Sequence, residues 1–247
     1  MLTDVHCHLT APELLQCLSE VIKSSIESGL RFLVTSGLGY EDCLRALEIS
    51  DYKFIYPSLG IAPYDLEGYE EVFSLIERER DRIVAVGEVG LDFWRGGRGE
   101  WDLQRKVFEE FIELAKSLDI PIVVHSRSAG KYAIEMLLKH QVNRVIMHAF
   151  DGRASYALKA AERGFMFSVP PSIARSPQKQ RLVKVLSLDN MLLESDAPVL
   201  APILNEVNYP KNVKVSAEWI SRLKEVSFEK VVERTYHNAV ELFEIRV

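Results

Sequence analysis

Two histidines separated by one residue, His6 and His8, stand near the start of the chain and could bind a metal ion. The segment Thr3–Cys7 is predicted to be a strand, and side chains two residues apart on a strand point to the same face. Both imidazoles therefore face one side of the strand, and Cys7 faces the other. Two imidazoles arranged in this way can bind one metal ion at about 2.0–2.1 Å each.

Further side chains that could bind metal follow apolar runs elsewhere in the chain. They are Glu88, His125, His148 and Asp196. Each apolar run predicts a buried strand, which would bury the side chain at its end unless that end opens into a site. Taken singly, either histidine could be a hydrogen-bonded core residue, Glu88 a turn residue and Asp196 the N-cap of a short helix. The repetition at several strand ends favours one shared metal site.

The number of these side chains indicates the kind of site. Four histidines and two carboxylates exceed the three protein ligands of a catalytic zinc site and suit two ions bridged by a carboxylate, about 3.5–4 Å apart. Imidazole favours Zn, Mn, Fe, Co or Ni, while oxygen ligands and open positions still permit Mg or Mn. Such ions turn a bound water into a nucleophile near neutral pH and neutralise an oxyanion or a phosphate. The sequence therefore predicts a hydrolase that uses two divalent metal ions.

The elements that must position these residues are short apolar runs separated by amphipathic helical patterns. Strands are expected at Thr3–Cys7, Phe32–Thr35, Phe54–Leu59, Ile83–Glu88, Ile122–His125, Arg144–His148, Phe165–Ser168 and Met191–Glu194. Eight strands alternating with helices in 247 residues favour an α/β fold, a (β/α)8 TIM barrel forming a single domain over residues 1–247. A doubly wound open sheet is the alternative. Active sites of such barrels lie at the carboxyl ends of the strands, which is where the candidate ligands fall.

Helices are predicted where apolar residues recur at every third or fourth position. The clearest such segments are Leu14–Ile22, Tyr69–Ile76, Phe108–Leu118, Ala217–Val226 and Phe228–Phe243. The last two follow the final strand and are expected to close the outer ring of the barrel. Between that strand and these helices, Ala197–Pro210 is predicted to be a long loop, and long loops in compact domains tend to be functional.

Composition limits the location and the partners of the protein. The sequence has no apolar run long enough to span a bilayer, and its N-terminus lacks the pattern of a secretory signal, so we expect a cytoplasmic protein with no membrane association. Its three cysteines are expected to be reduced thiols. The net charge of −6 counts against binding nucleic acid through overall surface charge. A nucleic-acid substrate would require local basic loops and bound cations.

Around these candidate ligands the sequence resembles the TatD family of metal-dependent deoxyribonucleases and hydrolases, within the amidohydrolase superfamily. The matching segments are Asp4–Leu9, Gly87–Asp92, Pro121–Arg127, His148–Gly152 and Leu193–Pro198. They occur in the order and at the spacing of the family and cover nearly the whole chain. The resemblance implies a (β/α)8 barrel, in agreement with the strand count.

The resemblance also assigns roles to the candidate residues. It implies one ion held by His6, His8, Glu88 and Asp196. It implies a second ion held by His125 and His148, with Glu88 as the bridge between the two ions. Asp196 would also be the general base that orients the attacking water, with Glu88 as its catalytic partner at the metal site. Glu194 would steady a ligand or its hydrogen bonds, although it could instead be the buried partner of an arginine.

The residues that would contact the substrate are less clearly marked. Arg127 follows His125, and its guanidinium fork fits a phosphate or carboxylate, although a structural salt bridge is an equal alternative. Trp94 and Arg95 lie in a predicted loop. There Trp94 could stack on a base or instead pack on the barrel rim, and Arg95 could meet the DNA backbone. The family usually carries a histidine, thought to touch the substrate phosphate, where this sequence has Ala62.

These features leave three functional hypotheses. The leading one is a phosphodiesterase, in particular a deoxyribonuclease acting on DNA by a two-metal, metal-hydroxide mechanism. The alternative is a small-molecule hydrolase of a phosphoester, lactone or amide that uses the same metal site, which Ala62 and the acidic composition favour. The third is a metal-binding protein without catalytic activity. We expect a monomer or a small homo-oligomer.

Overall fold

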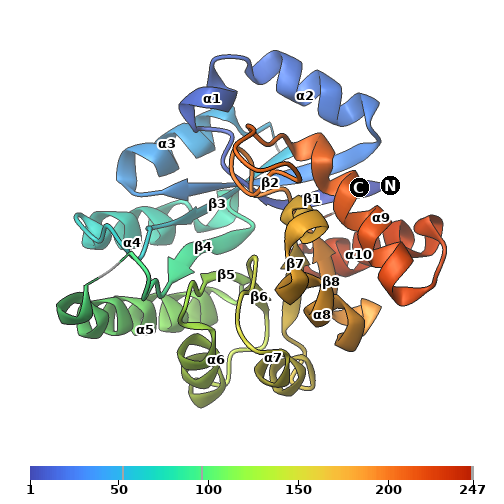
Figure 1. The fold of residues 1–247 in the computed structure, drawn as a ribbon. Coiled ribbons are helices and arrows are strands. Elements are labelled where there is room, and N and C mark those ends of the chain that lie inside the picture. The colour runs from blue at the N-terminus through green and yellow to red at the C-terminus, as the bar shows by residue number, and fades with distance from the viewer. Residues whose placement is uncertain (52, 96, 246–247) are drawn as a thin grey trace.

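The computed structural model describes residues 1–51, 53–95 and 97–245 and contains, over those residues, one eight-stranded parallel sheet. Its strands follow one another in chain order (Figure 1). They are β1 (Leu2–Cys7), β2 (Leu30–Leu38), β3 (Ile55–Gly60), β4 (Ala85–Gly90), β5 (Ile122–His125), β6 (Val145–Met147), β7 (Met166–Val169) and β8 (Met191–Leu193). The predicted strands are confirmed, and the differences are confined to their ends.

Hydrogen bonds between the region of β1 and the residues that follow β8 join the two ends of the sheet, which forms a nearly closed barrel. The backbone N–H of His8 donates to Ala197 O at 2.8 Å, and that of Asp196 donates to His6 O at 2.9 Å. Asp4, which is fully buried on β1, accepts hydrogen bonds from Ser195 N at 2.8 Å and from Ser195 Oγ at 2.5 Å. The (β/α)8 barrel is therefore confirmed, and the alternative of an open doubly wound sheet is wrong.

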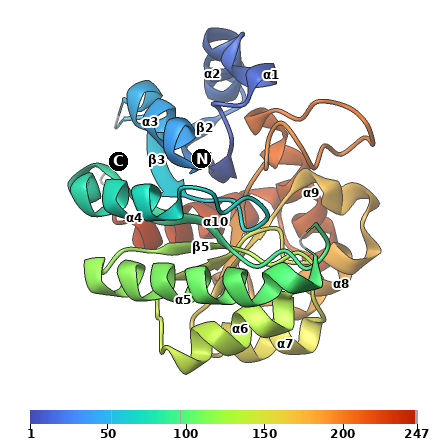
Figure 2. The ribbon, with the colours of Figure 1, turned by 90° about the vertical axis from the view of Figure 1, so that its left-hand side faces the viewer.

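Helices surround the strands (Figure 1). They are α1 (Pro12–Leu15), α2 (Leu18–Glu27), α3 (Tyr40–Ile49), α4 (Tyr69–Arg78), α5 (Trp101–Leu118), α6 (Gly130–Lys139), α7 (Ala154–Ala161), α8 (Pro177–Val185), α9 (Val213–Lys224) and α10 (Phe228–Phe243). Figure 2 faces α4 and α5, which pack side by side with the rings of Phe73 and Phe111 5.8 Å apart. The helix predicted at Leu14–Ile22 is in fact two helices, because Cys17 has φ −130° and ψ 34°, outside the helical region.

An apolar cluster supports the rim at which the candidate ligands lie. Val123, Ile146 and Leu192 are completely buried in it, together with Phe32 and Val34. Each of the first three lies two residues before a candidate site residue and therefore shares its face of the strand. Close packing beneath the rim leaves the polar side chains little freedom to move away from it.

The segment after β8 is the long loop that was predicted. It contains no helix or strand until a short 3₁₀ helix at Pro210–Asn212. Its first residues form a turn, in which Val199 N donates to Asp196 O at 2.8 Å, so Asp196 is not the N-cap of a helix. The side-chain amide of Asn208 donates to Ser195 O at 2.6 Å and to Val199 O at 2.8 Å, which holds the loop against the barrel rim.

None of the described helices combines the length and the hydropathy that crossing a bilayer requires.

Candidate metal centre

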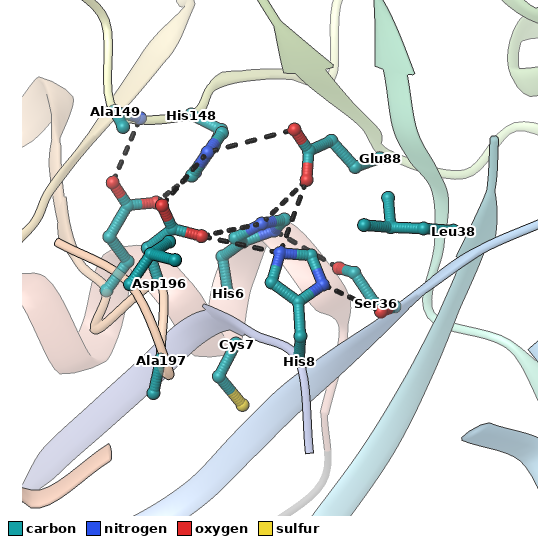
Figure 3. Close-up of polar contacts among 12 residues, drawn as sticks. His6, Cys7, His8, Ser36, Leu38, Glu88, His148, Ala149, Asp196 and Ala197 are labelled. Atoms are coloured by element: carbon teal, nitrogen blue, oxygen red, sulfur yellow. Dashed lines mark hydrogen bonds and ion pairs between the residues drawn. The ribbon is translucent and has the colours of Figure 1, made fainter. Parts of the chain in front are cut away.

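The six candidate ligands meet at the carboxyl ends of the strands, and Figure 3 shows the central part of this cluster. His6 lies on β1, Glu88 on β4 and His125 on β5, and the other three lie just past strand ends. Cys7 points away from the imidazoles on either side of it, and its thiol contacts Val34 O at 3.4 Å (Figure 3). The alternation expected for the first strand therefore holds.

The carboxylate of Glu88 lies between two pairs of imidazoles. Its Oε2 is 3.1 Å from His6 Nε2 and 3.5 Å from His8 Nε2. Its Oε1 is 2.5 Å from His125 Nδ1 and 3.9 Å from His148 Nε2. One oxygen thus faces each pair, which is the arrangement that a carboxylate bridging two cations requires.

The carboxylate of Asp196 also reaches imidazoles on both sides. Its Oδ1 lies 3.7 Å from His6 Nε2 and 3.3 Å from His8 Nε2, and its Oδ2 lies 3.8 Å from His148 Nε2. The side chain is nearly buried, and its backbone has the left-handed φ of 54°. The hydrogen bond from its backbone to His6 O fixes this strained residue beside β1.

The residues fit divalent metal ions. Three overlapping sets of side chains could each hold an ion, namely His6–His148–Asp196, His6–His8–Glu88 and Glu88–His125–His148. The Nε2 atom of His6 is buried and forms no hydrogen bond with proper geometry among the described residues, although Glu88 Oε2 lies 3.1 Å away. A buried nitrogen without a partner is costly unless a ligand satisfies it. The mixture of imidazole and carboxylate suits Zn, Mn, Co or Ni and permits Mg.

Strand β2 orients the first pair of imidazoles. Ser36 Oγ lies 3.1 Å from His6 Nδ1, and Ser36 O lies 3.0 Å from His8 Nδ1. Both rings consequently turn their Nε2 atoms toward the two carboxylates (Figure 3). Metal-binding histidines commonly use the second ring nitrogen in this way, which fixes the tautomer and the ring orientation.

Glu194 holds His148. Its Oε2 lies 2.7 Å from His148 Nδ1 and accepts a hydrogen bond from Ser168 Oγ at 2.6 Å, and its Oε1 accepts from Ala149 N at 2.9 Å. Glu194 is completely buried, and no arginine among the described residues forms an ion pair with it. The described contacts of Glu194 therefore favour a role beside His148 over a buried Glu–Arg pair.

Glu194→Gln is expected to weaken metal binding by about 10–100-fold, because the amide cannot accept both hydrogen bonds that orient His148 and its loop. Titration of the metal-free variant with Mn²⁺ or Zn²⁺ measures the change. Glu113→Gln is a matched control, since Glu113 Oε1 lies 2.5 Å from His140 Nδ1 on the protein surface, away from this site. Equal metal affinity in the Glu194 variant and the wild type would contradict this role.

Asp92 orients His125, a contact that the sequence did not indicate. Its Oδ2 lies 3.0 Å from His125 Nε2, while its Oδ1 accepts hydrogen bonds from Trp94 N at 2.9 Å and Arg95 N at 2.8 Å. His125 therefore presents Nδ1 to Glu88, unlike the three other imidazoles. The available signal was the position of Asp92 at the end of the glycine-containing segment that includes Glu88.

Three imidazoles have raised pKa values. Burial lowers the pKa of His8, but neighbouring carboxylates, led by Asp196, outweigh it and raise this pKa to about 9. Burial is likewise outweighed at His148, where carboxylates led by Glu194 raise the pKa to about 10. Burial also lowers the pKa of His125, but hydrogen bonds to Asp92 and Glu88 outweigh it and raise this pKa to about 9. Without metal, protons on these rings compensate the buried carboxylates.

Metal binding near pH 7 is expected to release protons, because an imidazole must be neutral to bind a metal. The pKa values of His8, His125 and His148 lie above 7, so the ion must displace their protons and its affinity falls as the pH is lowered. Calorimetric titrations with Zn²⁺ in two buffers of different ionisation enthalpy count the protons released. Heats that are independent of the buffer, with an affinity unchanged between about pH 6 and 8, would contradict the expected proton release.

A cavity of about 460 Å³ opens above the centre. Arg127, Arg95 and Tyr64 are among its lining residues. The Arg127 guanidinium lies 3.7 Å from the ring centroid of Trp94, and the Arg95 guanidinium lies 4.3 Å from the ring centroid of Tyr64. Trp94 is 63% exposed. Ala62 is buried and is not part of the described lining. The structure thus places Arg127 and Arg95 in the lining of the cavity, with Trp94 stacked on Arg127.

The chain is similar to known proteins along nearly its whole length. Residues 3–244 match the model of the family described as TatD related DNase. The human protein "Deoxyribonuclease TATDN3" is 39% identical over 98% of this chain and 94% of its own length. The Bacillus subtilis protein "Uncharacterized metal-dependent hydrolase YabD" is 34% identical over 99% of this chain and 100% of its own length.

A solved structure gives the same result. The crystal structure of YjjV, a TatD homologue from Escherichia coli K12, superposes with a TM-score of 0.92 at 25% identity and covers 99% of this chain and 98% of that one. The resemblance noted in the sequence is therefore confirmed at the level of family and fold. The chain belongs to the TatD related DNase family and is a metal-dependent hydrolase.

Proposed function

We propose that this protein hydrolyses phosphodiester bonds in DNA with the help of two divalent metal ions. The observation that carries the proposal is the position of Glu88, with one carboxylate oxygen facing each of two imidazole pairs. The similarity to a human protein named as a deoxyribonuclease supports DNA as the substrate.

In this proposal the six side chains divide between two ions. His6, His8, Glu88 and Asp196 would hold one ion. Glu88, His125 and His148 would hold the other. Bound divalent ions lower the pKa of coordinated water and neutralise charge on a phosphoryl group. The metals we expect are Zn, Mn, Mg, Co or Ni.

Asp196 is proposed as the general base. Burial raises its pKa, but the charge of His148 and the hydrogen bond to His8 outweigh burial and lower the pKa below its ordinary value. The carboxylate is therefore ionised near pH 7 and able to accept a proton. Because Asp196 also lines the cavity, it can orient a water molecule toward a substrate bound there.

The two arginines of the cavity lining are proposed to bind the substrate. Arg127 and Arg95 present planar guanidinium groups that match the oxygens of a phosphate. Each stacks on an aromatic ring, which limits its motion and keeps its donors available. The exposed ring of Trp94 would contact a base on the face or edge that Arg127 leaves uncovered.

The proposal is tested by comparing substrates with the metal-reconstituted protein. We expect hydrolysis of a single-stranded DNA oligomer and of a chromogenic phosphodiester, with metal-dependent turnover. DNA affinity should also fall as salt is added, because contacts to the backbone release counterions. The absence of phosphodiester hydrolysis with each of Mn, Mg, Zn, Co and Ni would refute the proposal.

A small-molecule hydrolase remains the second candidate function. The observations that favour it are the substitution at Ala62, the net charge of −6 and a cavity of about 460 Å³, a size that suits a small ligand. This candidate predicts turnover of a small phosphoester, lactone or amide and a DNA affinity that does not change with salt.

A further inference from the structure

Lys179 is a buried cation in the wall of the cavity. It lies on α8 and is 8% exposed, yet it lines the same cavity as Asp196, His148 and Ala149. Lysine is almost never buried to this degree unless an anionic group pairs with it. Its position therefore requires an explanation.

The described residues satisfy only part of the hydrogen-bonding capacity of the Lys179 ammonium group. Its Nζ donates one hydrogen bond, to Ala149 O at 2.8 Å, and it forms no ion pair with a described carboxylate. Burial lowers its pKa, while the charges of Glu194, Asp151 and Asp196 act in the opposite direction. An ammonium group has three N–H donors. Donors thus remain for a ligand in the cavity.

A second polar group in the lining also lacks a partner. Ser126, which follows His125 at the end of β5, is 3% exposed, and its Oγ has no hydrogen-bond partner among the described residues. Buried hydroxyl groups are normally satisfied. A cavity that contains an incompletely satisfied ammonium and an unpartnered hydroxyl is suited to a ligand rich in oxygen acceptors.

We infer that Lys179 binds an oxygen of the scissile phosphate, as a catalytic residue of the phosphodiester hydrolysis proposed above. Its ammonium is bound to the carbonyl of Ala149, the residue directly after the candidate ligand His148. Arg95 and Arg127 come from the loops after β4 and β5, whereas Lys179 comes from the helix after β7. The phosphate would therefore meet positive charge from more than one element of the barrel rim as negative charge develops on its oxygens.

Lys179 could instead serve only to hold the loop after β6. Its neighbour Gln178, which holds the same loop, allows the two roles to be distinguished. The side-chain amide of Gln178 donates to Phe150 O at 3.3 Å and to Gly152 O at 2.8 Å. Gln178 and Lys179 therefore hold the same loop after β6. Gln178 carries no charge and is not part of the described cavity lining. Replacing each residue by Met removes loop contacts in both cases but removes a cavity cation in only one.

The test compares Lys179→Met, Lys179→Arg and Gln178→Met in the metal-loaded protein. For Lys179→Met we expect kcat/KM on a chromogenic phosphodiester to fall about 100-fold, mainly through kcat, with metal content unchanged. Binding of inorganic phosphate, measured by calorimetry, should weaken about 10-fold. Lys179→Arg should recover part of both losses, and Gln178→Met should stay within about threefold of the wild type.

The outcomes separate this inference from the proposed function. Equal losses in Lys179→Met and Gln178→Met, or unchanged phosphate affinity in Lys179→Met, would overturn the inference. A wild type that binds no phosphate would overturn it as well. A wild type that binds phosphate through Lys179 but cleaves no phosphodiester would refute the proposed function and leave the anion-binding role supported.

Discussion

Asp196→Asn is expected to lower kcat by about 10³–10⁴-fold while leaving the fold intact. The amide has nearly the same shape and keeps one oxygen near His6 and His8, but it cannot accept a proton from water near pH 7. The backbone N–H of residue 196 still donates to His6 O, so the junction of β8 with β1 is preserved. The loss should therefore appear in turnover rather than in folding.

The measurement is kcat on a DNA oligomer at saturating metal, together with thermal unfolding. Asp189→Asn is a matched control, because it makes the same change at an exposed carboxylate that pairs with Arg234 outside the site. Full activity in the Asp196 variant would refute its assignment as the base. A cooperative unfolding transition like that of the wild type would show that the loss of activity is not caused by a loss of folded structure.

Glu88→Gln is expected to lower activity by at least about 10³-fold and to reduce the number of ions that remain bound. One of the two oxygens would be replaced by an NH₂ group, which repels a cation and cannot accept a hydrogen bond. Oε1 faces His125 and His148, while Oε2 faces His6 and His8. The substitution therefore removes the carboxylate oxygen that faces one of these two pairs of imidazoles.

Elemental analysis of the purified variant, combined with a metal titration, measures this effect. The exposed residue Glu71 on α4 provides the control variant Glu71→Gln, which changes the net charge equally. Retention of the wild-type metal content and activity by Glu88→Gln would show that the carboxylate does not bridge.

Residues at strand ends could be predicted from the sequence because burial leaves a local pattern. His125 and His148 each end an apolar run, and a parallel barrel brings all such ends to one rim. Counting the strands was therefore enough to place both residues beside His6 and His8. The exact ends of strands, and the break in the helix predicted at Leu14–Ile22, depended on local backbone conformation that apolar spacing does not report.

Residues that act through contact with another element could not be predicted. Ser36 and Ser168 lie within strands and reach the site only because the register of β2 and β7 places them beside His6 and Glu194. Asp92 required the loop after β4 to turn back toward His125. Lys179 lies within an ordinary helical pattern, and only the packing of α8 against the loop after β6 brings it into the cavity.

The number and position of bound divalent ions test the shared metal centre most directly. A crystal structure of the metal-reconstituted protein with anomalous scattering should contain two ions per chain, about 3.5–4 Å apart, one on each oxygen of Glu88. His6 Nε2, which has no hydrogen-bond partner among the described residues, should contact one of them. The shared metal centre would be contradicted by crystals grown at saturating metal that show no ion among the six side chains, or that show ions only at other places in the protein.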